Sequence, residues 1–142
     1  MIAAPIALAF ASAFAGAAAY VNLVEQPSRL ALDDRSMLAE WKPSDRRGFG
    51  MLGALALISA VAGFLAFQGA GDVRWLIGAI VIIASWPYMY FVVVPLNNRL
   101  LAVAPAEGSL DARELVTDWG ILEWGLTLIG IVATATFAWP LA

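Results

Sequence analysis

Four long stretches of the chain contain almost no charge. They cover residues 1–24, 48–71, 75–98 and 119–142, and Glu123 in the last stretch is the single charged residue within them. Each stretch has 24 residues, and a helix needs about 20 apolar residues to cross a hydrocarbon core of about 30 Å. Because the backbone must satisfy its own hydrogen bonds in lipid, the pattern predicts four membrane-spanning helices.

Composition supports this interpretation against a soluble helical bundle. Hydrophobic residues make up 62% of the chain and charged residues 13%, whereas soluble domains have about 45–50% and about 25%. The helices of a soluble bundle would also need a charged outer face, and these stretches are apolar all round. We predict an all-α integral membrane protein, a four-transmembrane-helix bundle in one domain, 1–142. Its expected spans cover about 2–24, 48–70, 74–97 and 114–139.

The basic residues predict how the bundle is oriented. Seven of the eight lie in the connections 25–47 and 98–113, and Arg74 alone lies at the other end. The positive-inside rule places both connections in the cytoplasm. We therefore expect an integral protein of the bacterial cytoplasmic membrane with both termini on the outer side.

The first connection contains the pattern of a short amphipathic helix. Asp33 or Asp34 can cap its start, and Pro43 is expected to end it. We expect this helix to lie in the headgroup layer between the first two spans. Its apolar face would consist of Met37, Leu38 and Trp41.

The residue types exclude much chemistry. The chain has no cysteine and no histidine, and its net charge is −3. These absences remove disulfides, thiolate metal sites, the commonest metal ligand and the usual general base. The small, mixed charge does not favour nucleic acid as a partner. We expect no metal site and no cofactor.

Glu123 is the first candidate site residue, because a carboxylate inside a span is costly unless it faces protein. Helical spacing places it on one face with Gly120, Thr127 and Gly130, with Trp119 at the edge. Two interpretations stay open at this stage. Glu123 forms a structural ion pair between helix ends, or it belongs to a functional site.

Two further groups accompany Glu123. Trp86, Pro87 and Tyr88 fall at the middle of the third span, and with Tyr90 they could line an aromatic cavity or simply fill a proline kink. Four span ends also meet on the connection side. We expect them to form a polar cap in which Arg29, Arg47 or Arg99 pairs with Glu123. The cap would consist of Glu25, Arg29, Arg47, Asn98 and Arg99.

Small residues predict how the helices pack. Ala7, Ala11, Ala15 and Ala19 form a stripe on the first span, and the second span has small residues at Gly53, Ala56, Ser59 and Gly63. Such stripes let helix backbones approach. We expect them to pack on neighbouring spans, with a homo-oligomer interface as the alternative.

Four segments together resemble a known family. They are LVEQPSRL at 23–30, EWKPSDRRGF at 40–49, WPYMYFVVVPLNNRLL at 86–101 and TDWGILEWGLTL at 117–128. In this order and spacing they look like the anthrone-oxygenase-like family of small four-span membrane proteins, mostly classed as a domain of unknown function. Its characterised members oxidise phenolic anthrones with molecular oxygen and without metal or flavin. The resemblance implies that Asn97, Trp119 and the aromatic residues of the pocket face the substrate.

The fourth span departs from the family pattern. Members usually have a tryptophan there, a histidine four residues later, and then an arginine and a threonine. Trp119 and Thr127 match, but Glu123 occupies the histidine position and Leu126 the arginine position. The departure affects the expected chemistry and leaves the expected fold intact.

Two functions follow from these observations. The first is binding of a lipophilic aromatic or quinone-like ligand in the bundle, at Trp86, Tyr88, Tyr90, Asn97, Trp119, Glu123 and Thr127. The second is a non-catalytic subunit of a larger membrane complex. A proton-coupled exporter is a third reading, but it usually needs its acid deeper in the membrane. Membrane lipids are partners in each case.

Overall fold

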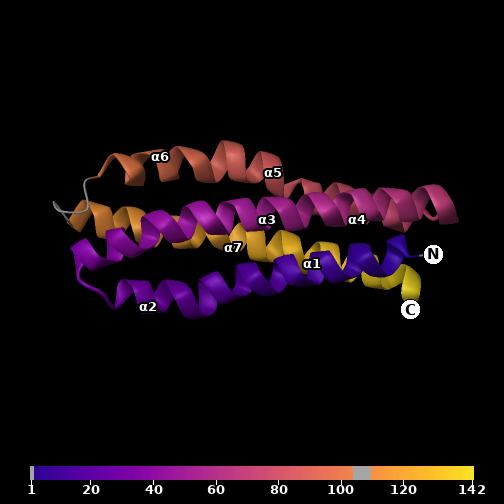
Figure 1. The fold of residues 1–142 in the computed structure, drawn as a ribbon, viewed down its shortest axis with the longest axis horizontal. Helices are drawn as coiled ribbons and strands as arrows, with labels where there is room; N and C mark the ends of the chain where they lie inside the picture. Colours follow the sequence, from indigo (N-terminus) through magenta and orange to yellow (C-terminus); the bar gives the residue numbers. More distant parts are fainter. Residues whose placement is uncertain (1, 104–109) are drawn as a thin grey trace.

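A computed structural model describes residues 2–103 and 110–142, with only the backbone described for Leu110. Four long helical segments lie side by side, and consecutive segments run in opposite directions (Figure 1). Both termini lie at one end of the bundle, and the two longer connections lie at the other. We call these the terminal end and the connection end.

The first span contains α1 (Ala3–Tyr20), the π-helical η1 (Val21–Glu25) and α2 (Gln26–Leu30), and the second is α3 (Asp34–Ala70). The third contains α4 (Val73–Ile83), α5 (Ser85–Tyr88), the π-helical η2 (Met89–Val93) and α6 (Val94–Ala102). The fourth contains α7 (Leu110–Ala138) and the 3₁₀ turn η3 (Trp139–Leu141). All four are long and apolar enough to cross a membrane. The predicted all-α fold with four long apolar helices is confirmed. At the connection end, these helices extend beyond the predicted spans.

Local sequence explains the helix boundaries. Asp33 caps α3, because its carboxylate accepts a hydrogen bond from the Ser36 amide at 3.0 Å. Gly71 ends α3 in the left-handed conformation, with φ of 69°. Asp72 then caps α4 by accepting from the Arg74 amide at 3.0 Å.

The first connection differs from the prediction. α3 continues through Pro43 without interruption, so there is no separate interfacial helix before the second span. Met37, Leu38 and Trp41 are fully buried instead of facing headgroups. They pack with Val93, Leu96 and Leu100 of the third span and with Val116 and Trp119 of α7. This burial offsets the backbone hydrogen bond that Pro43 cannot donate.

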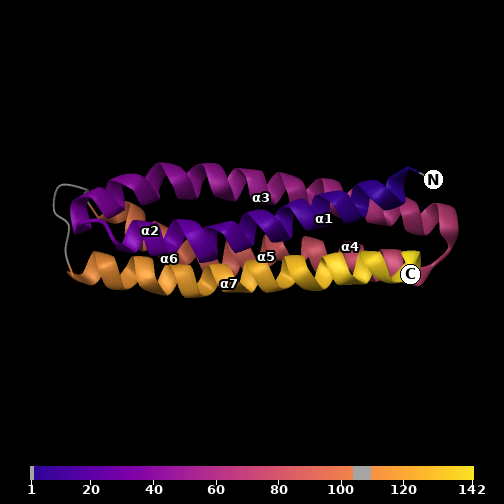
Figure 2. The ribbon, with the colours of Figure 1, turned by 90° about the horizontal axis from the view of Figure 1, so that it is seen from below.

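The small-residue stripes pack within the chain, as predicted. Ser59 on α3 donates a hydrogen bond to the Ala7 carbonyl of α1 at 2.8 Å. A Cβ atom at Gly130 on α7 would lie 2.8 Å from Cα of Ala15, so these two helices touch backbone to backbone. Figure 2 shows α1 and α2 lying between α3 and α7.

Candidate functional site

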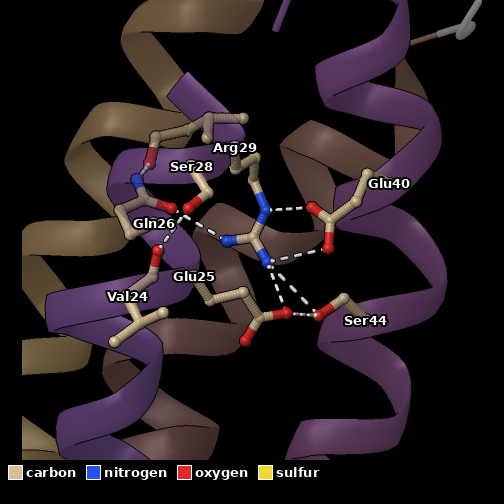
Figure 3. A network of polar contacts seen from close by, with 8 residues as sticks. Val24, Glu25, Gln26, Ser28, Arg29, Glu40 and Ser44 are labelled. Carbon is tan, nitrogen blue, oxygen red and sulfur yellow. Dashed lines mark hydrogen bonds and ion pairs between the residues drawn. The ribbon is translucent and has the colours of Figure 1, made fainter. Parts of the chain in front are cut away.

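A buried arginine links the first two spans at the connection end (Figure 3). Arg29 on α2 is 2% exposed, and its Nη2 lies 3.1 Å from Glu25 Oε1. Its Nε forms an ion pair with Glu40 on α3, and its Nη2 donates to Ser44 Oγ at 3.2 Å. Its Nη1 donates to Gln26 Oε1 at 2.8 Å. The guanidinium is thus engaged on all sides, by two carboxylates and two neutral oxygens.

Two tryptophans lie next to this arginine. The Arg29 guanidinium carbon is 5.1 Å from the centre of the Trp119 ring, a cation–π arrangement. Trp41 meets Trp119 edge to face at 5.9 Å. Trp119 is 3% exposed, and among the described residues its Nε1 has no hydrogen-bond partner. The indole therefore lies buried between Arg29 and Trp41.

Asp45 on α3 is held by an amide from the third span. Asn97 Nδ2 on α6 donates to both Asp45 carboxylate oxygens, at 3.1 and 3.0 Å. Asn97 is 5% exposed. Within residues 2–103 and 110–142, Asp45 forms no ion pair. The carboxylate is fixed in position by a neutral donor.

Glu123 on α7 faces the interior, as predicted, and is 5% exposed. The predicted pairing with Arg29, Arg47 or Arg99 is wrong, because Arg29 pairs with Glu25 and Glu40 and no ion pair involves Glu123 in the part of the chain that the structure describes. The reason is geometric. Arg29 lies beyond η1, where it faces the α3 acids.

These groups surround a cavity of about 540 Å³ between η1, α3 and α7. Its polar side chains include Glu25, Glu40, Asp45, Arg47 and Glu123. Apolar residues make up most of the remaining wall: Ala17, Val21, Phe49, Met51, Leu52, Met89, Trp119 and Leu126. Both π-helical segments contribute to the lining, and such segments often occur at functional sites.

The structure brings together only some of the predicted site residues. Glu25, Arg47, Trp119 and Glu123 line the cavity. Asn97 reaches it through Asp45. Asn98 and Arg99 are exposed, and Arg99 lies in a separate shallow groove beside Asp118.

The three aromatic residues predicted to line a cavity on the third span do not line this one. Trp86 is 43% exposed and donates to the Gly53 carbonyl at 3.0 Å. Tyr88 donates to the Leu122 carbonyl at 2.7 Å, and Tyr90 is 63% exposed. Trp86 and Tyr88 therefore connect the third span to α3 and α7, and Met89 of η2 lines the cavity.

Buried amides beside the cavity connect the first span to α7. Thr127 donates to Asn22 Oδ1 at 2.7 Å, and Asn22 Nδ2 donates to the Gly120 carbonyl at 3.0 Å. Gln26 Nε2 donates to the Val116 carbonyl at 2.8 Å. Thr127 is therefore a structural contact behind the cavity wall. The spacing of Asn22, Gln26 and Arg29 along one helix face was the signal that sequence reasoning missed.

Asp45 and Glu40 were also missed. They were assigned to the connection 25–47, in which a short helix was expected to end at Pro43, whereas they belong to one continuous helix with Ser44. Reading that segment as a single helix would place Glu40 and Ser44 on the same face, one turn apart. The four-residue spacing of Glu40 and Ser44 could have indicated this, but Pro43 was taken to end the helix between them.

The fold and the site define an integral membrane bundle of four helices with a polar, partly acidic cavity near one end. The family model for anthrone oxygenase matches residues 41–136, which include Asp45, Trp119 and Glu123. The chain belongs to the anthrone oxygenase family. Neither the curated proteins nor the solved structures gave a match.

Proposed function

We propose that this membrane protein binds a lipophilic aromatic or quinone-like molecule in the cavity between η1, α3 and α7. The observation that supports it is the cavity of about 540 Å³, with mostly apolar walls and a few converging polar groups. Ligand pockets typically measure about 300–1,000 Å³ and have this composition. Membership of the anthrone oxygenase family agrees with a flat aromatic ligand.

The wall offers complementary groups to such a molecule. Trp119 and Met89 provide surfaces for a ring. Asp45 and Glu123 can accept hydrogen bonds from hydroxyl groups. A ligand held this way has its ring system in the bundle and its polar edge toward the connection end.

The ligand would enter from the bilayer. Tyr20, Phe49 and Met51 line the cavity and are 58%, 37% and 52% exposed, so its mouth lies among apolar residues on the outer surface of the bundle. We propose that the connection end is cytoplasmic and both termini are outside, since seven of the eight basic residues lie in the two connections.

We propose that the protein binds this molecule and does not oxygenate it. Removal of a phenolic proton near neutral pH is a typical task of histidine, and the chain has none. Glu123 on α7 can accept a hydrogen bond from a phenol, which suffices for recognition.

The test uses purified protein in phosphatidylcholine nanodiscs with 1,8-dihydroxyanthraquinone as the probe. Saturable quenching of tryptophan fluorescence is expected. Gly48→Phe should abolish it, because Gly48 lines the cavity and a Cβ there meets nothing within 4 Å, so a ring can fill the cavity without a clash. Gly50→Phe is the matched control, since Gly50 has equal space but does not line this cavity.

Equal quenching in both variants would contradict the proposal. If the wild-type protein shows no saturable quenching and purifies only with a second protein, the alternative function is supported. That alternative is a non-catalytic subunit of a larger membrane complex. The same preparation, incubated with 1,8-dihydroxyanthrone in air, would reveal any oxidation to the quinone by absorbance.

A further inference from the structure

We propose that the cavity prefers a lipophilic molecule that carries a protonated amine. The inference rests on the proposed function, that the cavity takes a lipophilic ligand, and specifies the chemical group by which the ligand is recognised. The charges that surround the cavity support it.

Acids outnumber bases around the cavity. Four carboxylates line it, on three different helical elements, against one lining arginine, Arg47, and one arginine behind the wall, Arg29. The acids are Glu25, Glu40, Asp45 and Glu123. A ligand in this position therefore meets a negative surface, which repels an anion and attracts a cation.

Arg29 forms its ion pairs with Glu25 and Glu40, and not with the other two acids of the lining. Its guanidinium is engaged by Glu25, Glu40, Ser44 and Gln26. These four partners occupy its donors, so it is not available to a ligand or to Glu123. Glu25 and Glu40 are satisfied by the same contacts.

Asp45 and Glu123 remain without a cationic partner among the described residues. Asp45 accepts hydrogen bonds from neutral donors, the Asn97 amide among them, and Glu123 is 5% exposed and faces the cavity. A buried carboxylate is costly unless a cation compensates it. A ligand ammonium group between these two acids would supply that compensation.

The remaining lining indicates an organic cation. No three acidic side chains within the described residues are placed to hold one metal ion. Much of the remaining lining is apolar and includes Val21, Leu52 and Leu126. An ammonium group attached to a planar or aliphatic body satisfies both parts of the cavity.

The test compares two probes that differ in one group, 9-(methylaminomethyl)anthracene and 9-(hydroxymethyl)anthracene. Binding is measured by energy transfer from tryptophan to anthracene in phosphatidylcholine nanodiscs, which carry no net lipid charge. The amine should bind at least about tenfold more tightly than the alcohol, because hydrogen bonds between charged groups are the stronger ones.

Four variants test the cause of the preference. Glu123→Gln and Asp45→Asn should each remove most of it while alcohol binding persists. Asp118→Asn removes an exposed acid that lies on α7, like Glu123, but outside the cavity, so it should leave the preference for the amine unchanged. Arg47→Gln should increase the preference, because it removes the lining cation.

Three outcomes would overturn the inference: equal binding of the two probes, tighter binding of the alcohol, or a preference that both acid substitutions leave intact. In each of these outcomes the proposed function still stands. Absence of saturable binding for both probes, with no response to 1,8-dihydroxyanthraquinone either, would instead contradict the proposed function itself.

Discussion

The two ends of the bundle are built in different ways. At the terminal end, small residues let the helices touch, and a Cβ atom at Gly78 would lie 2.4 Å from the Phe137 ring. At the connection end, large and charged side chains such as Trp41, Trp119 and Arg29 are buried between helices. The described cavity lies among the bulky and charged residues, toward the connection end.

The difference also separates two kinds of stabilisation. The terminal end depends on van der Waals contact between backbones, as in many membrane bundles. The connection end depends on ion pairs and amide hydrogen bonds that connect the first span to α3 and α7. Such groups are sensitive to the removal of one partner, because the other remains buried.

The largest effect is expected from Arg29→Met. It leaves Glu25 and Glu40 without their cation and should lower the free energy of unfolding by about 3 kcal/mol. Arg74→Met, which breaks the solvent-screened Arg74–Asp72 pair at the terminal end, should have a much smaller effect. Reversible unfolding in mixed micelles measures both, and equal losses would remove the proposed contrast between the ends.

Gly130→Val should come next. The new side chain collides with backbone of Ala15, which cannot rotate away, and overpacking of this kind costs about 2 kcal/mol. Gly16→Val on α1 is the control, since a Cβ there meets nothing within 4 Å. The same unfolding assay applies. A stable Gly130→Val variant would show that α1 and α7 are not in backbone contact.

A smaller effect is expected for the buried pair Asn22 and Thr127. Asn22→Leu and Thr127→Val each remove one side of a 2.7 Å hydrogen bond. A double-mutant cycle should give a coupling energy of about 0.6 kcal/mol, the average for such bonds between membrane helices. Zero coupling would mean that the two side chains do not interact.

The smallest effect concerns the start of α3. Hydrogen bonds from Ser36 lower the pKa of Asp33 below its usual 3.8. The cap therefore stabilises α3 above pH 3.8 and weakens as the pH falls through the lowered value. Hydrogen exchange of the Ser36 amide, corrected for its intrinsic rate, should accelerate over that range. In the Asp33→Ala variant, the corrected exchange rate of the Ser36 amide should already be high and should not change with pH. A rate equal to that of the wild-type protein would contradict the cap.

Part of the candidate site could be predicted from the sequence. Glu123 was identified because a carboxylate within a span must face protein, and Trp119 because it lies one turn before it. Arg29 was identified as part of a polar cap, but its partner was not, since several acids lie within reach at this end. Tyr90 was assigned to the site by its position in the span, and the structure turns it outward.

The sequence by itself determined the four apolar helices, their alternating direction and the burial of Glu123. These follow from the cost of placing charges and unpaired backbone groups in hydrocarbon, which depends on residue type and segment length alone. Tertiary structure decided that α3 continues through Pro43, that Arg29 pairs with Glu25 and Glu40, and that Met89 faces the cavity. Those outcomes depend on which helix surfaces meet and on the two π-helical turns. Both involve contacts between segments that lie far apart in the sequence.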